Sequence, residues 1–195
     1  MLTRTTRLSA LDDLQNRTRA HLAEHRCGAY TFNDGIGLMR VVSTYVVANQ
    51  PNVTPRILEL GCALGYSAAC MATALPEAMI DTIEMDATHV ALAQQNFTEL
   101  NLTQQITVHH GQFDTVITKL NTRYDAVFFD GFAPSSELLQ QLRKLLNPNG
   151  VLIMANLGLA HGSDLRRLSQ ALNRTEHWVK LDAIENGSTL VFRRV

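Results

Sequence analysis

The feature that most constrains the fold is an alternation of short apolar runs with amphipathic stretches, which begins at Arg56. The apolar runs are nearly continuous, which is typical of strands buried on both faces of a parallel sheet. The stretches between them carry apolar residues at helical spacing. We therefore predict an α/β fold in which helices cover both faces of a parallel sheet. The predicted strands are residues 57–60, 79–83, 106–108, 126–129 and 151–154.

The end of the chain departs from this alternation. After a predicted helix at residues 164–172, two β-rich runs at 177–183 and 189–193 are separated only by a short connection. That connection contains Asn186-Gly187, and Asn-Gly is a strong signal for a tight turn between antiparallel strands. We therefore predict an antiparallel hairpin at the edge of the sheet, which brings the predicted strands to seven.

The first part of the chain, residues 1–50, is predicted to be a helical extension within a single domain that spans residues 1–195. Ser9 followed by Asp12 resembles a capping box at a helix start. A glycine-containing break at 33–37 precedes a second predicted helix at 38–48. Later helix boundaries are also marked by sequence. These signals are Asp86 or Thr88 as an N-cap, a start after Ser135-Ser136, and a stop at 147–150.

Composition excludes several classes of protein. Charged residues make up 18% of the chain and the net charge is −1, whereas a surface that grips nucleic acid or anionic lipid is usually clearly basic. No apolar run approaches the roughly 18 residues of a membrane span, and no signal core follows the first residues. The three cysteines form no CxxC pair, which favours reduced thiols. We expect a cytoplasmic protein with neither a membrane nor a nucleic-acid partner.

Residues 56–67 combine an apolar strand, a glycine turn and a helix start. Gly61 would let the chain turn sharply, and Gly65 would let the backbone approach a ligand. The helix N-terminus offers free N–H groups for polar ligand atoms. Glu84, at the end of the next predicted strand, could accept hydrogen bonds from both hydroxyls of a ribose. Together these features predict a nucleoside site.

The residues around the glycines indicate which kind of nucleoside ligand the site could bind. The chain has neither the G-x-G-x-x-G spacing of a pyrophosphate site nor a phosphate loop. Glu59 stands just before the glycines, where its charge would repel a phosphate but suit a cationic amino group. The ligand is therefore predicted to carry adenosine without a diphosphate, and S-adenosyl-L-methionine fits that description.

At these residues the sequence resembles class I S-adenosylmethionine-dependent methyltransferases, and within that class the catechol and caffeoyl-CoA type of O-methyltransferase. The resemblance covers about residues 30–195. It implies a Rossmann-like fold with a seven-stranded, mostly parallel sheet, a C-terminal antiparallel hairpin and N-terminal helices. It also implies O-methylation of a small-molecule acceptor. The segments that carry it are residues 57–67, 82–86, 91–96, 110–111, 124–130, 149–156 and 186–190.

The resemblance implies roles for individual residues. Asp130 would be catalytic at the methyl-transfer end, with Asn156 second, and Asp130 would also touch the cofactor. Glu84 would hold the ribose, and residues 34–38 would close over the methionine part. The other cofactor-binding residues implied are Glu59, Gly61, Ala63, Gly65 and Ser67 around the methionine, and Met85, Gly111, Gln112 and Phe113 around the adenine.

Two departures from the family pattern bear on metal use. Metal-dependent members have an Asp-Asn pair at the end of strand five, where this chain has Ala155-Asn156. They also have a lysine after the strand-four Asp, where this chain has Gly131. Hard cations prefer several oxygen ligands, so only a weak site for Mg²⁺ is expected and no metal ligands are assigned.

Other functions stay open as alternatives. Residues 130–134 also resemble a loop of the methyltransferase domain that finishes methylaminomethyl-uridine in tRNA, and Arg166, Arg167, Arg193 and Arg194 could form a small basic face. An NAD-dependent oxidoreductase and a non-catalytic S-adenosylmethionine-binding protein are further alternatives. A homodimer formed through the N-terminal helices is open as well.

Several histidines are candidates for metal binding or proton transfer. His21 and His25, with Cys27 nearby, could suggest zinc, but no second ligand cluster is visible in the sequence, so metal binding is not predicted there. His161 follows the fifth predicted strand and is a candidate general base. His109 and His110 are expected to be packed or solvated.

Overall fold

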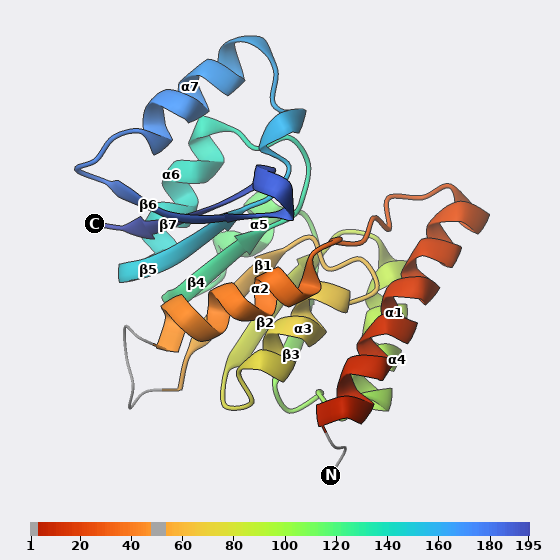
Figure 1. The fold of residues 1–195 in the computed structure, drawn as a ribbon. Helices are drawn as coiled ribbons and strands as arrows, with labels where there is room; N and C mark the ends of the chain where they lie inside the picture. The colour runs from red at the N-terminus through yellow and green to blue at the C-terminus, as the bar shows by residue number, and fades with distance from the viewer. Residues whose placement is uncertain (1–3, 48–53) are drawn as a thin grey trace.

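A single seven-stranded sheet forms the centre of the computed structural model, which describes residues 4–47 and 54–195 (Figure 1). The strand order is β3-β2-β1-β4-β5-β7-β6. The first five strands pair in parallel, β7 pairs antiparallel to β5, and β6 pairs antiparallel to β7. The predicted parallel sheet with a terminal hairpin is therefore confirmed. The strands are β1 Arg56–Leu60, β2 Met79–Glu84, β3 Ile106–His110, β4 Tyr124–Phe129, β5 Leu146–Met154, β6 Trp178–Ile184 and β7 Thr189–Arg194.

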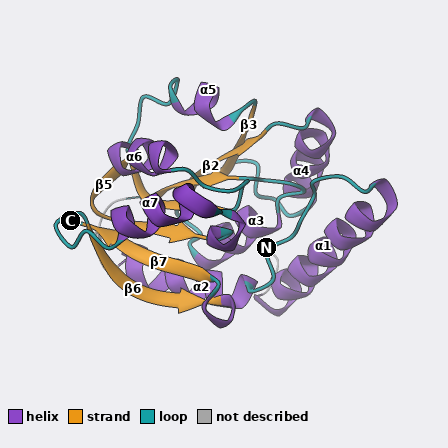
Figure 2. Cartoon of the chain, turned by 90° about the horizontal axis from the view of Figure 1, so that it is seen from above, coloured by secondary structure: helices purple, strands orange, loops and turns teal. Residues whose placement is uncertain are grey.

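The helices cover both faces of the sheet, and each face has its own apolar core. One core packs the first four helices against residues such as Ile57 and Phe128, and the other packs the last three against residues such as Leu58 and Phe129. Figure 2 shows the β6–β7 hairpin at the opposite end of the molecule from α1 and α4. The helices are α1 Arg4–His25, α2 Gly35–Val41, α3 Tyr66–Ala74, α4 Ala87–Glu99, α5 Phe113–Ile117, α6 Ser136–Leu145 and α7 Gly162–Leu172.

Two predicted helix starts near the N-terminus are wrong. Helix α1 begins at Arg4, so Ser9 lies inside it and is no cap. Helix α2 begins at Gly35, because Asp34 is its N-cap and accepts a hydrogen bond from the Gly37 N–H at 2.8 Å. A π-helical turn, Val42–Val46, continues it. The structure does not describe Ala48, where the second helix was predicted to end. It also does not describe residues 1–3 and 48–50 of the predicted N-terminal extension.

The later boundary signals are mostly confirmed. Asp86 caps α4 and Ser135 caps α6. In the hairpin, Asn186 and Gly187 both have positive φ, as an Asn-Gly turn requires. The predicted stop at 147–150 agrees with the end of α6 at Leu145, and β5 follows at once, because Leu146 already pairs with Tyr124.

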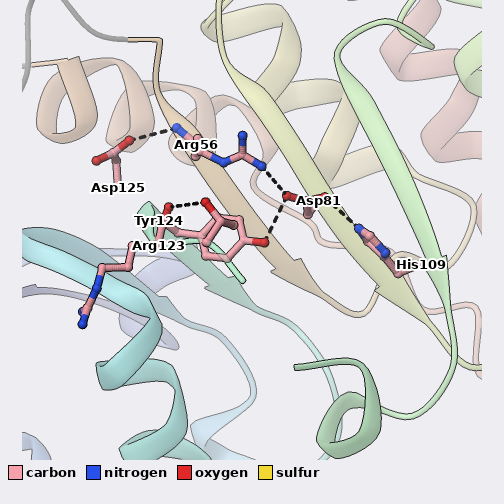
Figure 3. Close-up of polar contacts among 7 residues, drawn as sticks. Arg56, Asp81, His109, Arg123, Tyr124 and Asp125 are labelled. Atoms are coloured by element: carbon pink, nitrogen blue, oxygen red, sulfur yellow. Dashed lines mark hydrogen bonds and ion pairs between the residues drawn. The ribbon is translucent and has the colours of Figure 1, made fainter. Parts of the chain in front are cut away.

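Asp81 of β2 ties four strands together (Figure 3). Its carboxylate accepts hydrogen bonds from the Arg56 guanidinium at 3.2 Å and from the Tyr124 hydroxyl at 3.0 Å, and His109 Nε2 lies 2.7 Å from it. Burial and the adjacent Asp81 raise the pKa of Tyr124. His109 is thus part of the packed sheet, as expected. The contacts join β1, β2, β3 and β4 and stabilise the sheet beneath the site.

Among the described residues, none of the helices combines the length and the apolar character that crossing a membrane requires.

Candidate active site

A cavity of about 620 Å³ opens at the carboxyl ends of the parallel strands. Ligands of open α/β sheets bind in this crevice, at the point where the strand order reverses, and here that point lies between β1 and β4. The volume lies within the range typical of small-molecule sites. Its walls are Gly28, Tyr30, Thr31, Phe32, Asn33, Gly61, Ala63, Glu84, Met85, Asp86, His89, Phe113, Asp130, Gly131, Phe132, Asn156, Leu159 and Glu185.

The glycine turn after β1 forms the floor of the cavity. Gly61 has φ +102°, and a Cβ there would lie 2.6 Å from the backbone oxygen of Asp130, so only glycine fits. The turn is held from two sides: the Ala63 N–H donates to Glu84 Oε2 at 2.8 Å, and Asn96 Nδ2 donates to the Leu64 carbonyl at 2.9 Å. Its backbone is therefore fixed before any ligand binds.

Gly65 packs against a neighbouring helix. It has φ +94°, and a Cβ there would lie 2.5 Å from the ring of Phe97 on α4. It does not line the cavity. The missing side chain makes room for helix packing, and its predicted contact with a ligand stays a prediction.

Glu84 lies at the end of β2 and faces the cavity. Oε2 accepts from Ala63, and Oε1 accepts from the Asp86 N–H at 2.9 Å. Each carboxylate oxygen can accept a further hydrogen bond, so two acceptors remain for a vicinal diol. Met85, which is 43% exposed, borders the same wall.

Glu59 is fully buried and does not reach the cavity, contrary to its predicted contact with the ligand. Ser67 Oγ donates to Glu59 Oε1 at 2.5 Å, and Thr82 Oγ1 donates to Oε2. Burial raises the pKa of Glu59 to about 7, although both hydroxyl donors oppose that shift. Ser67 lines a separate cavity of about 10 Å³, which also touches Gly61 and Asp130 and is close to the volume of one water.

Asp130, after β4, is the most perturbed acid that lines the cavity. Burial, with the charges of Glu59 and Glu185, raises its pKa to about 8. Asn156 opposes the shift, because its Nδ2 donates to Asp130 Oδ1 at 2.9 Å. A carboxyl group with this pKa can hold or release a proton near neutral pH.

The residues at this end of the cavity would make only a weak site for a Mg²⁺ ion. Position 155 is a buried alanine and offers no ligand atom. The Asn156 amide nitrogen donates to Asp130 and to the Gly131 carbonyl, both at 2.9 Å, so the amide oxygen is the atom that could bind a cation. The strand ends therefore offer one carboxylate, that of Asp130, and one amide oxygen to a hard cation.

The structure brings together some of the predicted residues and separates others. Gly111 and Gln112 lie outside the cavity, as do Glu59, Gly65 and Ser67. His161 is exposed and does not line it either. The predicted residues that do line it are Gly61, Ala63, Glu84, Met85, Phe113, Asp130 and Asn156.

In this structure Asp34 caps α2 and none of residues 34–38 lines the cavity, so their closure over the methionine part stays a prediction. The wall comes instead from Gly28 and from Tyr30 to Asn33. The sequence did not indicate these residues, nor Leu159 and Glu185, because irregular segments carry no periodic signal. It did not indicate His89 either, because the side of α4 that borders the cavity depends on tertiary packing. Tyr30 and Phe132 are 73% and 62% exposed at the mouth, an exposure that the sequence does not reveal.

Comparison with known proteins agrees with this geometry. A family described as "Methyltransferase domain" matches residues 58–157. A catechol O-methyltransferase of Niastella koreensis is 35% identical over 115 residues, which are 56% of this chain and 52% of that protein. A catechol O-methyltransferase of Sus scrofa is 34% identical over 128 residues, 60% of this chain and 67% of that protein. The chain thus spans about half to two thirds of these relatives.

Solved structures share the fold. The O-methyltransferase from Bacillus cereus in complex with SAH superposes with a TM-score of 0.77 at 18% identity, over 96% of this chain and 90% of that one. TomG from Streptomyces achromogenes, an O-methyltransferase in complex with SAM, superposes with a TM-score of 0.75 at 22% identity. The superposition covers 95% of this chain and 89% of that one. The matched family, the curated relatives and the shared fold together show that this chain belongs to the methyltransferase domain family, as a class I member related to the catechol O-methyltransferases.

Proposed function

We propose that the protein transfers a methyl group from S-adenosylmethionine to an oxygen of a small-molecule acceptor. The observation that carries this proposal is one cavity whose wall includes both Glu84, at the end of β2, and Asp130, after β4. Glu84 suits a ribose, and Asp130 is an acid whose pKa of about 8 suits proton transfer.

The cofactor would lie along the strand ends. Glu84 would accept from the ribose hydroxyls, and Met85 and Phe113 would contact the adenine. The Gly61–Ala63 backbone would face the methionine part, whose amino group could reach towards Ser67 and Asp130 around the small cavity. Glu59 would act from behind, by orienting Ser67 and by adding negative charge near a cationic ligand.

The cofactor supplies an activated methyl group on a sulfonium. The protein's share is to orient the acceptor for in-line attack and to take its proton. Asp130 would accept the proton of the attacking hydroxyl as the new C–O bond forms and the C–S bond breaks, which leaves S-adenosylhomocysteine. Asn156 would hold Asp130 in position through the 2.9 Å hydrogen bond.

No Mg²⁺ ion takes part in this proposal, because Ala155 leaves the strand ends with only a weak site for a hard cation. The acceptor would be a small apolar molecule, since Tyr30, Phe132 and Leu159 present exposed apolar surface where it would enter. The carboxylates of Glu84, Asp130 and Glu185 on the same walls disfavour a nucleic acid.

Transfer of labelled methyl from S-adenosylmethionine to a panel of phenols and other small hydroxyl compounds tests this function. We expect turnover by the wild type. In Asp130→Asn we expect turnover to fall by about 100- to 10,000-fold, the range for loss of a general base. Asp114→Asn, an exposed acid on α5, is the matched control and should keep full turnover. Equal turnover in all three proteins would remove Asp130 from the mechanism, and methylation of RNA alone would overturn the small-molecule acceptor.

A further inference from the structure

A second cluster of chemically active side chains lies behind one wall of the cavity. His21 of α1, Cys27 just after α1 and His89 of α4 bring their ligand atoms within 4.8 Å of one another. Among the described residues, this is the single group of three or more His, Cys, Asp or Glu side chains placed to hold a metal ion. The sequence alone could not reveal it, because His89 comes from a distant helix.

His89 is unusual for a buried histidine. Its side chain is only 4% exposed, and its ring makes no hydrogen bond within the described part of the chain. Its Nδ1 lies 3.8 Å from Glu84 Oε1, which leaves Nε2 for another partner. The geometry therefore leaves Nε2 of His89 open to a ligand shared with His21 and Cys27.

His21 and Cys27 complete the set. The His21 ring lies edge-on to His89, with centroids 5.5 Å apart, and both His21 and Cys27 are half-buried. The His25 ring lies beside that of His21, with centroids 4.4 Å apart.

We propose that His21, Cys27 and His89 bind a zinc ion. Two imidazoles and one thiolate form a ligand set that binds Zn²⁺ in preference to hard cations. Three protein ligands leave a fourth position for solvent or another side chain. The ligand atoms must converge by a small amount to reach zinc–ligand distances, which side-chain rotation in the loop after α1 can supply.

The site would tether the segment that forms the cavity wall. Cys27 directly precedes the wall segment. Gly28 and the residues from Tyr30 to Asn33 line the cavity. His89 also lines it. A bound zinc ion would therefore join the C-terminal end of α1, this wall segment and α4 into one unit. A carboxylate on the far side of a ligating histidine, as Glu84 is for His89, is a common support of such sites.

Titration of the metal-depleted protein with Co²⁺, a spectroscopic stand-in for Zn²⁺, tests the site without any cofactor. We expect about one equivalent to bind, with a thiolate-to-cobalt charge-transfer band and the visible bands of tetrahedral cobalt, both removed by added Zn²⁺. Cys27→Ser should abolish the charge-transfer band. His21→Gln and His89→Gln should weaken binding by at least about 10-fold. His161→Gln, an exposed histidine outside the cluster, should bind like the wild type.

The variants are first shown to be folded by circular dichroism, and Zn²⁺ should raise the melting temperature of the wild type but not of Cys27→Ser. Absence of the charge-transfer band in the wild type would overturn the proposal. So would its persistence in Cys27→Ser, which would assign the thiolate to Cys62 or Cys70. These outcomes are independent of methyl transfer, because neither cofactor nor acceptor is present.

Discussion

At the scale of residues, two carboxyl groups, the buried Glu59 and the half-buried Asp130, contribute to how the free protein responds to pH. Both have raised pKa values, about 7 for Glu59 and about 8 for Asp130, whereas in the unfolded chain they ionise near their ordinary values. Between about pH 5 and pH 8 the unfolded state therefore binds fewer protons than the folded state, and stability falls as pH rises.

Replacement of Glu59 tests this response. Glu59→Gln keeps the shape and can still bond to Ser67 and Thr82 but does not ionise. We expect the melting temperature of the cofactor-free wild type to fall between about pH 5 and pH 8, and that of Glu59→Gln to fall less, so that the variant melts higher at the alkaline end. The measurement is a melting curve at each pH. Two parallel curves would contradict a raised pKa at Glu59.

Ala155 offers a gain-of-function test of the metal argument. We expect Mg²⁺ to change neither the melting temperature nor the turnover of the wild type. Ala155→Asp adds a buried carboxylate beside Asp130 and Asn156, so it should lower the melting temperature without metal and make it rise when Mg²⁺ is added. Thermal melts with and without Mg²⁺ measure both effects. A wild type that responds to Mg²⁺ would show that the site needs no carboxylate at position 155.

At the scale of elements, the strands were predictable and the irregular segments were not. The apolar runs predicted the central parallel strands because a strand buried on both faces needs unbroken apolar residues, as Ala126 to Phe129 in β4 illustrate. Segments such as Gly28 to Asn33 follow no period, so their position over the cavity could not be predicted. The environment of Glu59 was not predictable either. Its position before the glycine turn was evident, but its burial and its hydrogen bonds with Ser67 and Thr82 depend on tertiary structure.

The contact of α4 with the glycine turn gives a test at this scale. Gly65→Ala places a Cβ at 2.5 Å from the Phe97 ring in a backbone conformation that alanine disfavours. We expect a loss of about 1–3 kcal/mol in the free energy of unfolding. Gly158→Ala, where a Cβ has open space and φ is ordinary, should cost little. Chemical denaturation compares them. Weaker cofactor binding with unchanged stability in Gly65→Ala would restore the predicted ligand role.

At the scale of the whole molecule, the sheet supplies the fixed half of the site and the N-terminal elements supply the other half. Glu84, Asp130 and Asn156 follow strands, whereas the opposite wall belongs to the chain after α1. The fold-defining part of the site could therefore be predicted from the strand pattern, and the acceptor-facing part could not. A homodimer and a cytoplasmic location stay predictions from the sequence.

The central claim is that Glu84 holds the cofactor in this cavity, and calorimetric titration with S-adenosylhomocysteine tests it most directly. We predict about one equivalent bound to the wild type. Glu84→Gln should bind at least about 10-fold more weakly, because it loses a charged acceptor for the ribose hydroxyls. Glu77→Gln, an exposed acid outside the cavity, should bind like the wild type. No binding to the folded wild type, or equal binding to Glu84→Gln, would contradict the account.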